Sequence, residues 1–292
     1  MKELLGTIVT AMITDKNEKN LFAQKGGNTL KVVDEEVDNY EIGDMIEGFV
    51  YVNQKGDFVM MTEIPEIHSE TYGWGEVVAV QHDLGVFVDV DWIGKDLVVS
   101  LDDLPPMMTV WPRKEDRLYL SVTADDKDRM WGELAPVDVL LQDIQQGNEE
   151  MHNDDVSGTV VSALKAGSYV ALEDGYVGFV HPNERDEEPR LGKHVEGRII
   201  GLREDGVLYM SLLPRAYEVM DEDASMLFEV LKRSEDYRIP YHDKSNPDDI
   251  REYFGISKGQ FKRAVGRLMK DNIVKQDKEG TYLTKEAIEE KL

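Results

Sequence analysis

Short runs of β-branched and aromatic residues recur along the first three quarters of the chain, separated by Gly, Asp and Asn. Three segments begin alike, with "GTIVTAMI" from Gly6, "GEVVAVQH" from Gly75 and "GTVVSALK" from Gly158. They close on "GDFVMMTE", "DRLYLSVT" and "DGVLYMSLL". This alternation predicts about five short strands in each unit. Such a set fits a small closed barrel, because closure removes most exposed strand edges.

The boundaries expected from this pattern are 1–64, 65–124 and 156–214 for three barrels, 125–155 for a linker and 221–292 for a last domain. The linker differs from the barrels because its apolar positions favour one or two short amphipathic helices around a proline. These apolar residues are Met130, Trp131, Leu134, Val139, Leu140 and Ile144. Its acid-rich end predicts a solvated linker, and a protein contact there is the alternative.

The last seventy or so residues change to a helical period. "DASMLFEVLKR" predicts an amphipathic helix, and "SNPDDIREYFG" has a capping residue, an early proline and acids at the positive end of the helix dipole. A third helix follows from Ser257, and then "NIVKQDKEGTYLT" predicts two strands around a turn, before a short final helix. This order is typical of a winged helix.

The third helix is unusual because Gly255 to Lys270 carries five positive charges and no negative one. At 100° per residue its apolar side chains share one face, and the opposite face is basic. The inward set is Phe261, Ala264, Val265, Leu268 and Met269. The candidate nucleic-acid contacts are in three places. Arg263, Arg267 and Lys270 lie on the face opposite the apolar residues, Lys258 and Lys262 flank the apolar face, and Lys275 and Lys278 lie on the hairpin that follows. A merely solvated helix and a protein-contact surface are the alternatives.

The whole chain is acidic, with 33 basic and 59 acidic residues and a net charge of −26. Residues 222–292 nevertheless hold 14 basic and 15 acidic side chains, so almost all of the negative charge lies before them. Acidic segments repel phosphate, and the neutral last domain does not. The total charge therefore does not exclude a nucleic-acid partner.

No pattern for catalysis is found in the sequence. Cysteine is absent, the six histidines are scattered, and neither a phosphate-binding GxxxxGK[ST] loop nor a GxSxG elbow occurs. We therefore expect no enzyme, no cofactor and no metal. No apolar run is long enough for a signal peptide or a membrane span, which predicts a cytoplasmic protein without a membrane partner.

The third unit resembles the RNA-binding "S-one" domain, an OB-fold repeat. The resemblance rests on Gly158, "AGSYVAL", "GFVHPNE", "LGKHVEGRI" and "LYMSL" in that order. It implies that the repeated barrels are OB folds. Together with the element order of the last domain, the expected fold is mainly β, with three tandem OB-fold barrels followed by a C-terminal α+β winged-helix domain. The resemblance also implies that Tyr169 and His181 contact RNA, because they match the aromatic and His positions of the family.

Further candidates in the third unit are Phe179, which alternation places on the same face as His181, and the cations Lys165, Lys193 and Arg198. An exposed ring there can stack a base, although Phe179 could equally lie in the core. Ala166 replaces an aromatic residue that is common in the family.

The first two units resemble the family less. The second keeps Phe87 at the position of Tyr169, with Leu84 and Val99 at the other aromatic and His positions, and the first keeps Phe22. Phe87 and Phe22 are therefore weaker candidates. We expect both acidic units to act as spacers or protein-contact modules.

Over its whole length the chain resembles the conserved virulence factor B family. That resemblance implies a cytosolic, non-catalytic RNA-binding regulator that affects the expression of other genes. The residues themselves favour a monomer that binds single-stranded RNA through the third barrel and the basic helix. Two alternatives stay open: a transcription regulator that binds duplex DNA through the winged helix, and a scaffold for a protein partner of unknown kind.

Overall fold

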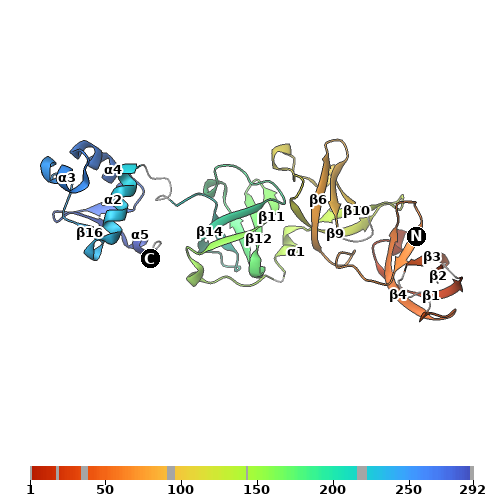
Figure 1. Cartoon of the computed structure of the whole chain (residues 1–292). Helices are drawn as coiled ribbons and strands as arrows, with labels where there is room; N and C mark the ends of the chain where they lie inside the picture. The colour runs from red at the N-terminus through yellow and green to blue at the C-terminus, as the bar shows by residue number, and fades with distance from the viewer. Residues whose placement is uncertain are drawn as a thin grey trace. The chain divides into compact units, whose positions relative to one another are not determined.

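The computed structural model describes residues 2–17, 20–33, 39–90, 96–142, 144–215 and 222–289. It divides into two compact units, 1–212 and 213–292. The first unit contains three closed five-stranded barrels, and the second contains helices and a three-stranded sheet (Figure 1). The protein is therefore mainly β, and its helices gather in the second unit.

The three barrels share one strand order. Barrel 1 consists of β1 (Ile8–Lys16), β2 (Leu21–Lys25), β3 (Asn28–Val33), β4 (Met45–Val52) and β5 (Phe58–Met61). Barrel 2 consists of β6 (Gly73–Gln81), β7 (Gly85–Asp89), β8 (Leu97–Ser100), β9 (Arg117–Ala124) and β10 (Met130–Leu134). Barrel 3 consists of β11 (Asp155–Leu164), β12 (Gly167–Leu172), β13 (Val177–Val180), β14 (His194–Leu202) and β15 (Leu208–Ser211). In each, the order is first, second, third, fifth and fourth strand, and the third pairs in parallel with the fifth.

The expected helical start of the linker is wrong, because Met130, Trp131 and Leu134 lie on β10, the fifth strand of barrel 2. β10 runs antiparallel to β9 and parallel to β8, and its first three residues alternate between buried and half-buried. Cross-strand pairing overrides the helical spacing here, since a barrel that ended at β9 would leave a strand edge open. The linker's only α-helix within the described residues is α1 (Val137–Leu140).

Each barrel has its own apolar core, and barrel 2 shares its core with its neighbours. Phe49 and Tyr51 of barrel 1 are at most 3% exposed and pack with the core of barrel 2. Leu191 of barrel 3, 3% exposed, packs with the same cluster. These apolar contacts join the barrels into one compact unit.

The second unit has the elements that the helical period predicts. They are α2 (Glu222–Arg233), β16 (Arg238–Ile239), α3 (Pro247–Phe254), α4 (Lys258–Lys270), β17 (Val274–Gln276), β18 (Thr281–Leu283) and α5 (Lys285–Glu289). β18 lies between β16 and β17 in the sheet. Residues 290–292 of the expected final helix lie outside the described residues.

Capping determines where α3 and α4 begin and end. Asn246 caps α3, and Gly255 ends it with a φ of 71°, a left-handed conformation that glycine adopts without strain. Ser257 and Gln260 form a reciprocal capping box at the start of α4. Four of the five expected inward residues of α4 are buried, but Met269 is 45% exposed. It lies on the last turn, beyond the stripe that ends with Leu268.

Candidate nucleic-acid interface

A β-bulge in the first strand aligns the three barrels with one another. In each barrel an aromatic residue of the second strand pairs with the residue just after the bulge; the pairs are Asp15–Phe22, Ala79–Phe87 and Ser162–Tyr169. Phe22, Phe87 and Tyr169 are therefore equivalent positions. Cross-strand pairing then extends from each of them to the third and fifth strands, which defines one outward row in each barrel.

In barrel 3 this row consists of three rings, Tyr169, Phe179 and Tyr209, which we call the aromatic row. Tyr169 and Phe179 have ring centroids 5.0 Å apart, and Phe179 and Tyr209 are 6.3 Å apart, both edge to face. The residues on either side of each ring are buried, whereas the rings are half-buried or exposed. The row therefore lies on the outer surface of the barrel, not in its core.

Gly167 supports the middle ring of the row. A Cβ atom at this position would lie 2.4 Å from Cζ of Phe179 and 2.6 Å from the carbonyl oxygen of Val180. Its φ of +150° also disfavours any other residue. The Phe179 ring thus packs directly on the backbone of Gly167, which holds the ring in place.

An arginine lies beside the aromatic row. Cζ of Arg203 is 5.8 Å from the ring centroids of both Tyr169 and Phe179, and its Nη1 donates a hydrogen bond of 3.3 Å to the Tyr169 hydroxyl. Nε of Arg203 also donates to Oδ1 of Asp205 at 2.7 Å. This contact lowers the pKa of Asp205 and, together with the Tyr169 hydrogen bond, raises that of Arg203. The site therefore keeps one cation against the rings and one anion next to it.

Sequence reasoning missed Tyr209 and Arg203. Tyr209 occurs in the alternating "LYMS" run, where it is the outward residue between two buried ones. Its pairing with Phe179 depends on the parallel contact of β13 with β15, strands that are separated by the whole of β14. Alternation could have placed Tyr209 outside the barrel, but not beside Phe179.

His181 is exposed and lies just after β13, where it caps a short 3-10 helix. Its Nδ1 accepts a hydrogen bond of 3.2 Å from the backbone N–H of Asn183. Ser100 takes the same capping position in barrel 2, where its hydroxyl accepts a hydrogen bond of 3.3 Å from the backbone N–H of Asp102. The residue equivalent to His181 is therefore Ser100, and the assignment of Val99, which is buried, was wrong by one position.

The three predicted cations of barrel 3 do not gather at one place. Lys165 is exposed in the turn between β11 and β12. Arg198 is half-buried on β14 and pairs with Ser211, two residues along β15 from Tyr209. Lys193 lines a separate cleft of about 610 Å³ together with Arg185 and other residues.

The equivalent rows of the other barrels lack a run of three rings. Barrel 2 has Phe87, Val98 and Trp131, so an aliphatic residue separates its two rings. Val98 and Trp131 also line a cleft of about 510 Å³ together with Phe58 of barrel 1. Leu84 is 43% exposed before β7, outside this row.

Barrel 1 has Phe22, Lys31 and Val59 in its row. Val59 is 1% exposed and packs with the core of barrel 2. The row of barrel 1 therefore offers a single ring, Phe22, beside an exposed lysine.

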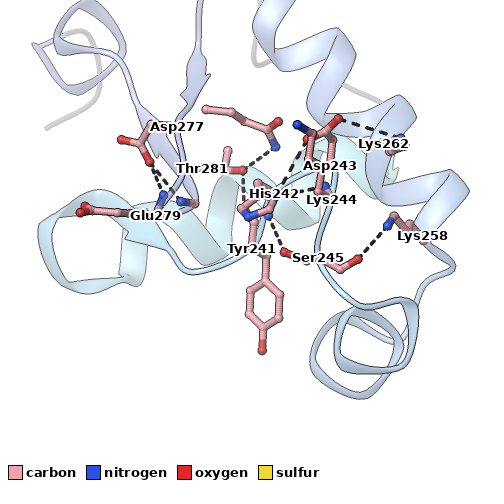
Figure 2. A network of polar contacts seen from close by, with 12 residues as sticks. Tyr241, His242, Asp243, Lys244, Ser245, Lys258, Lys262, Asp277, Glu279 and Thr281 are labelled. Carbon is pink, nitrogen blue, oxygen red and sulfur yellow. Dashed lines mark hydrogen bonds and ion pairs between the residues drawn. The ribbon is translucent and has the colours of Figure 1, made fainter.

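The basic residues of α4 fall into two groups. Lys258 donates from Nζ to the carbonyl oxygen of Ser245 at 2.8 Å, and Nζ of Lys262 lies 4.0 Å from Oδ2 of Asp243 (Figure 2). These two lysines contact the loop that precedes α3. The exposed residues Arg263, Arg267 and Lys270 form the second group, which we call the basic face.

The wing and the start of α3 also carry negative charge. On the wing, Lys275 and Lys278 are exposed, but Asp277 lies between them in sequence and forms a two-point ion pair with Arg238. That pair lowers the pKa of Asp277 to about 2. The first turn of α3 carries Asp248 and Asp249. Positive charge is thus concentrated on α4.

Within the described ranges, no group of three or more His, Cys, Asp or Glu side chains is placed to hold a metal ion. None of the described helices is both long and apolar enough to cross a membrane.

The family models assign the domains in the same order as the structure. An S1 domain matches residues 5–63, a CvfB first S1-like domain matches 72–133, the second domain of virulence regulatory factor CvfB matches 141–214, and a CvfB-like winged helix domain matches 225–283. The conserved virulence factor B of Staphylococcus epidermidis is 37% identical over 88% of this chain and 85% of its own length. The chain belongs to the conserved virulence factor B family.

Two further relatives extend over nearly the whole chain. The uncharacterized protein YitL of Bacillus subtilis is 40% identical, over 95% of this chain and 93% of its own length. A crystal structure of a multidomain protein with nucleic acid binding domains from Streptococcus pneumoniae is 40% identical, with a TM-score of 0.66 over 97% of this chain and 99% of that one. The S1-type and winged-helix domains of the family indicate nucleic-acid binding.

Proposed function

We propose that this protein is a non-catalytic RNA-binding regulator that contacts single-stranded RNA through barrel 3 and α4. The observation that carries the proposal is the aromatic row, in which Tyr169, Phe179 and Tyr209 pair across three strands on an outer surface. The strand order and the parallel pairing of β13 with β15 support an OB-fold assignment.

Single-stranded RNA fits this row better than a duplex does. Bases that are not paired can turn outward and stack on rings, and each such contact is worth roughly 1–3 kcal/mol. Arg203 lies 5.8 Å from two of the ring centroids and adds a cation at the same surface. We assign three further RNA contacts to barrel 3, namely His181, Lys165 and Arg198. Lys193 would contact only a part of the RNA that extends beyond the aromatic row.

The basic face of α4 supplies phosphate contacts in this proposal. Arg263 has Gly259 beneath it, since a Cβ atom there would lie 3.6 Å from Nη1 of Arg263. In helix-turn-helix docking on duplex DNA the helix before the recognition helix crosses the backbone. Asp248 and Asp249 on α3 would repel that backbone, which favours RNA over duplex DNA as the partner.

The regulatory part of the proposal comes from the family. One of the matching family models is named after a virulence regulatory factor, and the Staphylococcus epidermidis relative is named a virulence factor. RNA binding without catalysis can regulate expression after transcription, and we propose that role, in the cytoplasm, for this chain. The acidic front barrels would then limit indiscriminate binding to phosphate.

The test is a fluorescence-anisotropy titration with a single-stranded RNA and a duplex DNA at low and moderate salt. We expect tighter binding of RNA, and a variant with Arg263, Arg267 and Lys270 changed to Ala should bind more weakly. Its salt dependence should be shallower by up to ~0.7 per lost phosphate contact. The matched control changes Lys258 and Lys262 to Gln, because these lysines of the same helix contact the loop before α3 and lie outside the basic face. Preferred binding of the duplex would replace this proposal with transcriptional regulation, and binding of neither would favour a protein scaffold.

A further inference from the structure

A third cleft, of about 530 Å³, lies between barrels 2 and 3, and the three rings of the aromatic row are not among its lining residues. One wall comes from the outer face of β6 and β9 and includes Trp74 and Tyr119. The opposite wall comes from barrel 3 and includes Tyr176 and His194, and Leu140 of α1 contributes as well. A volume of this size is typical of small-molecule sites.

Direct bonds hold the two walls together. Arg190 of barrel 3 donates from Nε and Nη2 to the two carboxylate oxygens of Asp116, at 2.6 and 2.8 Å. Asp116 is only 6% exposed, so this pair is shielded from water. The backbone N–H of Arg117 also donates to the carbonyl oxygen of Gly192 at 3.0 Å. The cleft is therefore bounded by barrels that are bonded to each other.

The wall from barrel 2 is aromatic. Trp74 and Tyr119 are cross-strand partners with ring centroids 5.0 Å apart, and Tyr72 lies 6.0 Å from Tyr119. Cζ of Arg117 is 5.3 Å from the centre of the Trp74 ring. Burial raises the pKa of Tyr119, and Glu66 and Tyr72 raise it further, so its hydroxyl stays a neutral donor. This wall offers flat apolar faces with polar groups at their edges.

The wall from barrel 3 is more polar. Glu173 and His194 are exposed and Tyr176 is half-buried, and all three line the cleft. Their carboxylate, imidazole and hydroxyl groups can accept or donate hydrogen bonds to the edge of a flat ligand. Arg117 is the cleft's permanent cation among the described lining residues.

We propose that this cleft binds a nucleobase, which stacks on the ring wall of Trp74 and Tyr119 and meets the polar wall of barrel 3 with its edge. A nucleobase has two apolar faces and an edge with donors and acceptors, which matches the two walls. Its source is either a free nucleotide or an unpaired base of an RNA strand, and only the second rests on the proposed function. Arg117 is placed to contact the attached phosphate.

The experiment measures quenching of tryptophan fluorescence in the full chain. The probes are the mononucleotides AMP and UMP in one arm, and single-stranded oligo(A) and oligo(U) RNA in the other. We expect saturable quenching that Trp74→Phe largely removes, because Trp74 belongs to the ring wall of the cleft, whereas Trp111 and Trp131 are not among its lining residues. The fourth tryptophan, Trp92, lies outside the described residues. Quenching that Trp74→Phe leaves unchanged would contradict the proposal.

Two variants test the cleft without relying on the probe residue. Tyr119→Leu should weaken nucleotide binding roughly 5- to 150-fold through lost stacking. Ala171→Phe removes no ring but fills the cleft from barrel 3, and it should abolish binding that calorimetry measures in the wild type. The matched control, Tyr253→Leu, removes an exposed ring of the second unit and should leave mononucleotide binding unchanged.

The two arms separate this inference from the proposed function. If the chain binds mononucleotides but no RNA, and Tyr119→Leu weakens the nucleotide binding, the nucleobase cleft is supported and the proposed function is not. Binding of RNA but not of mononucleotides, with RNA affinity unchanged in Tyr119→Leu and Ala171→Phe, would overturn the cleft and leave the proposed function intact. If RNA quenches the fluorescence but mononucleotides do not, and Ala171→Phe removes this quenching, the nucleobase in the cleft comes from an RNA strand.

Discussion

Barrels 2 and 3 have the same strand order, the same bulge position and the same capped turn after the third strand, yet their outward rows differ. Barrel 3 has three successive rings, whereas barrel 2 has Val98 between Phe87 and Trp131. Both rows have an Arg–Asp pair beside them, Arg203–Asp205 in one and Arg129–Asp125 in the other. Cζ of Arg129 lies 5.1 Å from the centroid of the Trp131 ring.

In each strand, one set of alternate residues determines the fold and the other set determines the surface of the barrel. The inward residues of a strand specify the barrel, and the outward residues are free to differ. A repeated barrel is therefore no evidence of a repeated binding site. Under the proposed function, the outward row of barrel 3 binds RNA and the equivalent row of barrel 2 does not.

The largest effect is expected from removal of rings. Changing Phe179 and Tyr209 to Ala together should weaken RNA binding at least about 30-fold, since two stacked bases are worth roughly 2–6 kcal/mol. Anisotropy titration measures this loss. The matched control changes Val98 and Trp131 of barrel 2 to Ala. An equal loss in that control would mean that the outward rows of both barrels bind RNA.

A smaller loss is expected when the support of the middle ring changes. Gly167→Ala places a Cβ atom against Phe179 and Val180, so the ring must move or the barrel must strain. We expect a loss of roughly 1–3 kcal/mol in the free energy of unfolding and several-fold weaker RNA binding. Denaturant melts and anisotropy measure both. Gly266→Ala is the contrasting control, because its Cβ would meet open space on α4, where alanine should stabilise by up to ~1 kcal/mol.

A small gain is expected when the anion beside the aromatic row is removed. Asp205→Asn leaves Arg203 against the rings without its carboxylate, so RNA binding should tighten by no more than about fivefold, the range of an exposed charge pair. Asp125→Asn in barrel 2 should leave RNA binding unchanged. Weaker binding in Asp205→Asn would show that the carboxylate positions Arg203 for the RNA.

The pH dependence of the same pair has a defined sign. Arg203 lowers the folded-state pKa of Asp205, so the ion pair contributes stability above the unfolded pKa and loses it as pH falls through the folded one. The RNA affinity of the wild type should therefore rise towards that of Asp205→Asn only at pH values below the ordinary range of an aspartate. A convergence near neutral pH would contradict the lowered pKa.

The smallest effect is expected from restoring the missing ring. Val98→Phe gives barrel 2 three successive ring positions, but Val98 and Trp131 line a cleft with Phe58 of barrel 1. We expect the RNA affinity to change by less than about twofold, because an RNA strand cannot lie along a row of side chains that faces a neighbouring barrel. A clear gain would mean that ring composition alone separates the two barrels.

The sequence by itself determined the three repeats, most strands and the order of the second unit. Alternation is local, so the buried Val180 next to the half-buried Phe179 could be predicted from "GFVH". The caps of α3 and α4 at Asn246 and Ser257 were predictable for the same reason, because capping involves residues a few positions apart.

Only the tertiary structure decided which of these residues meet. Tyr209 and Arg203 join Tyr169 and Phe179 because a barrel closes through pairs of strands that are distant in sequence. The same closure made β10 a strand despite its helical spacing. On α4 the sequence pattern could not distinguish Lys258, which donates a hydrogen bond to the Ser245 carbonyl oxygen, from the residues of the basic face. The periodicity of the sequence predicts which face of a strand or helix a side chain is on, and the pairing of strands distant in sequence determines which other side chains it contacts.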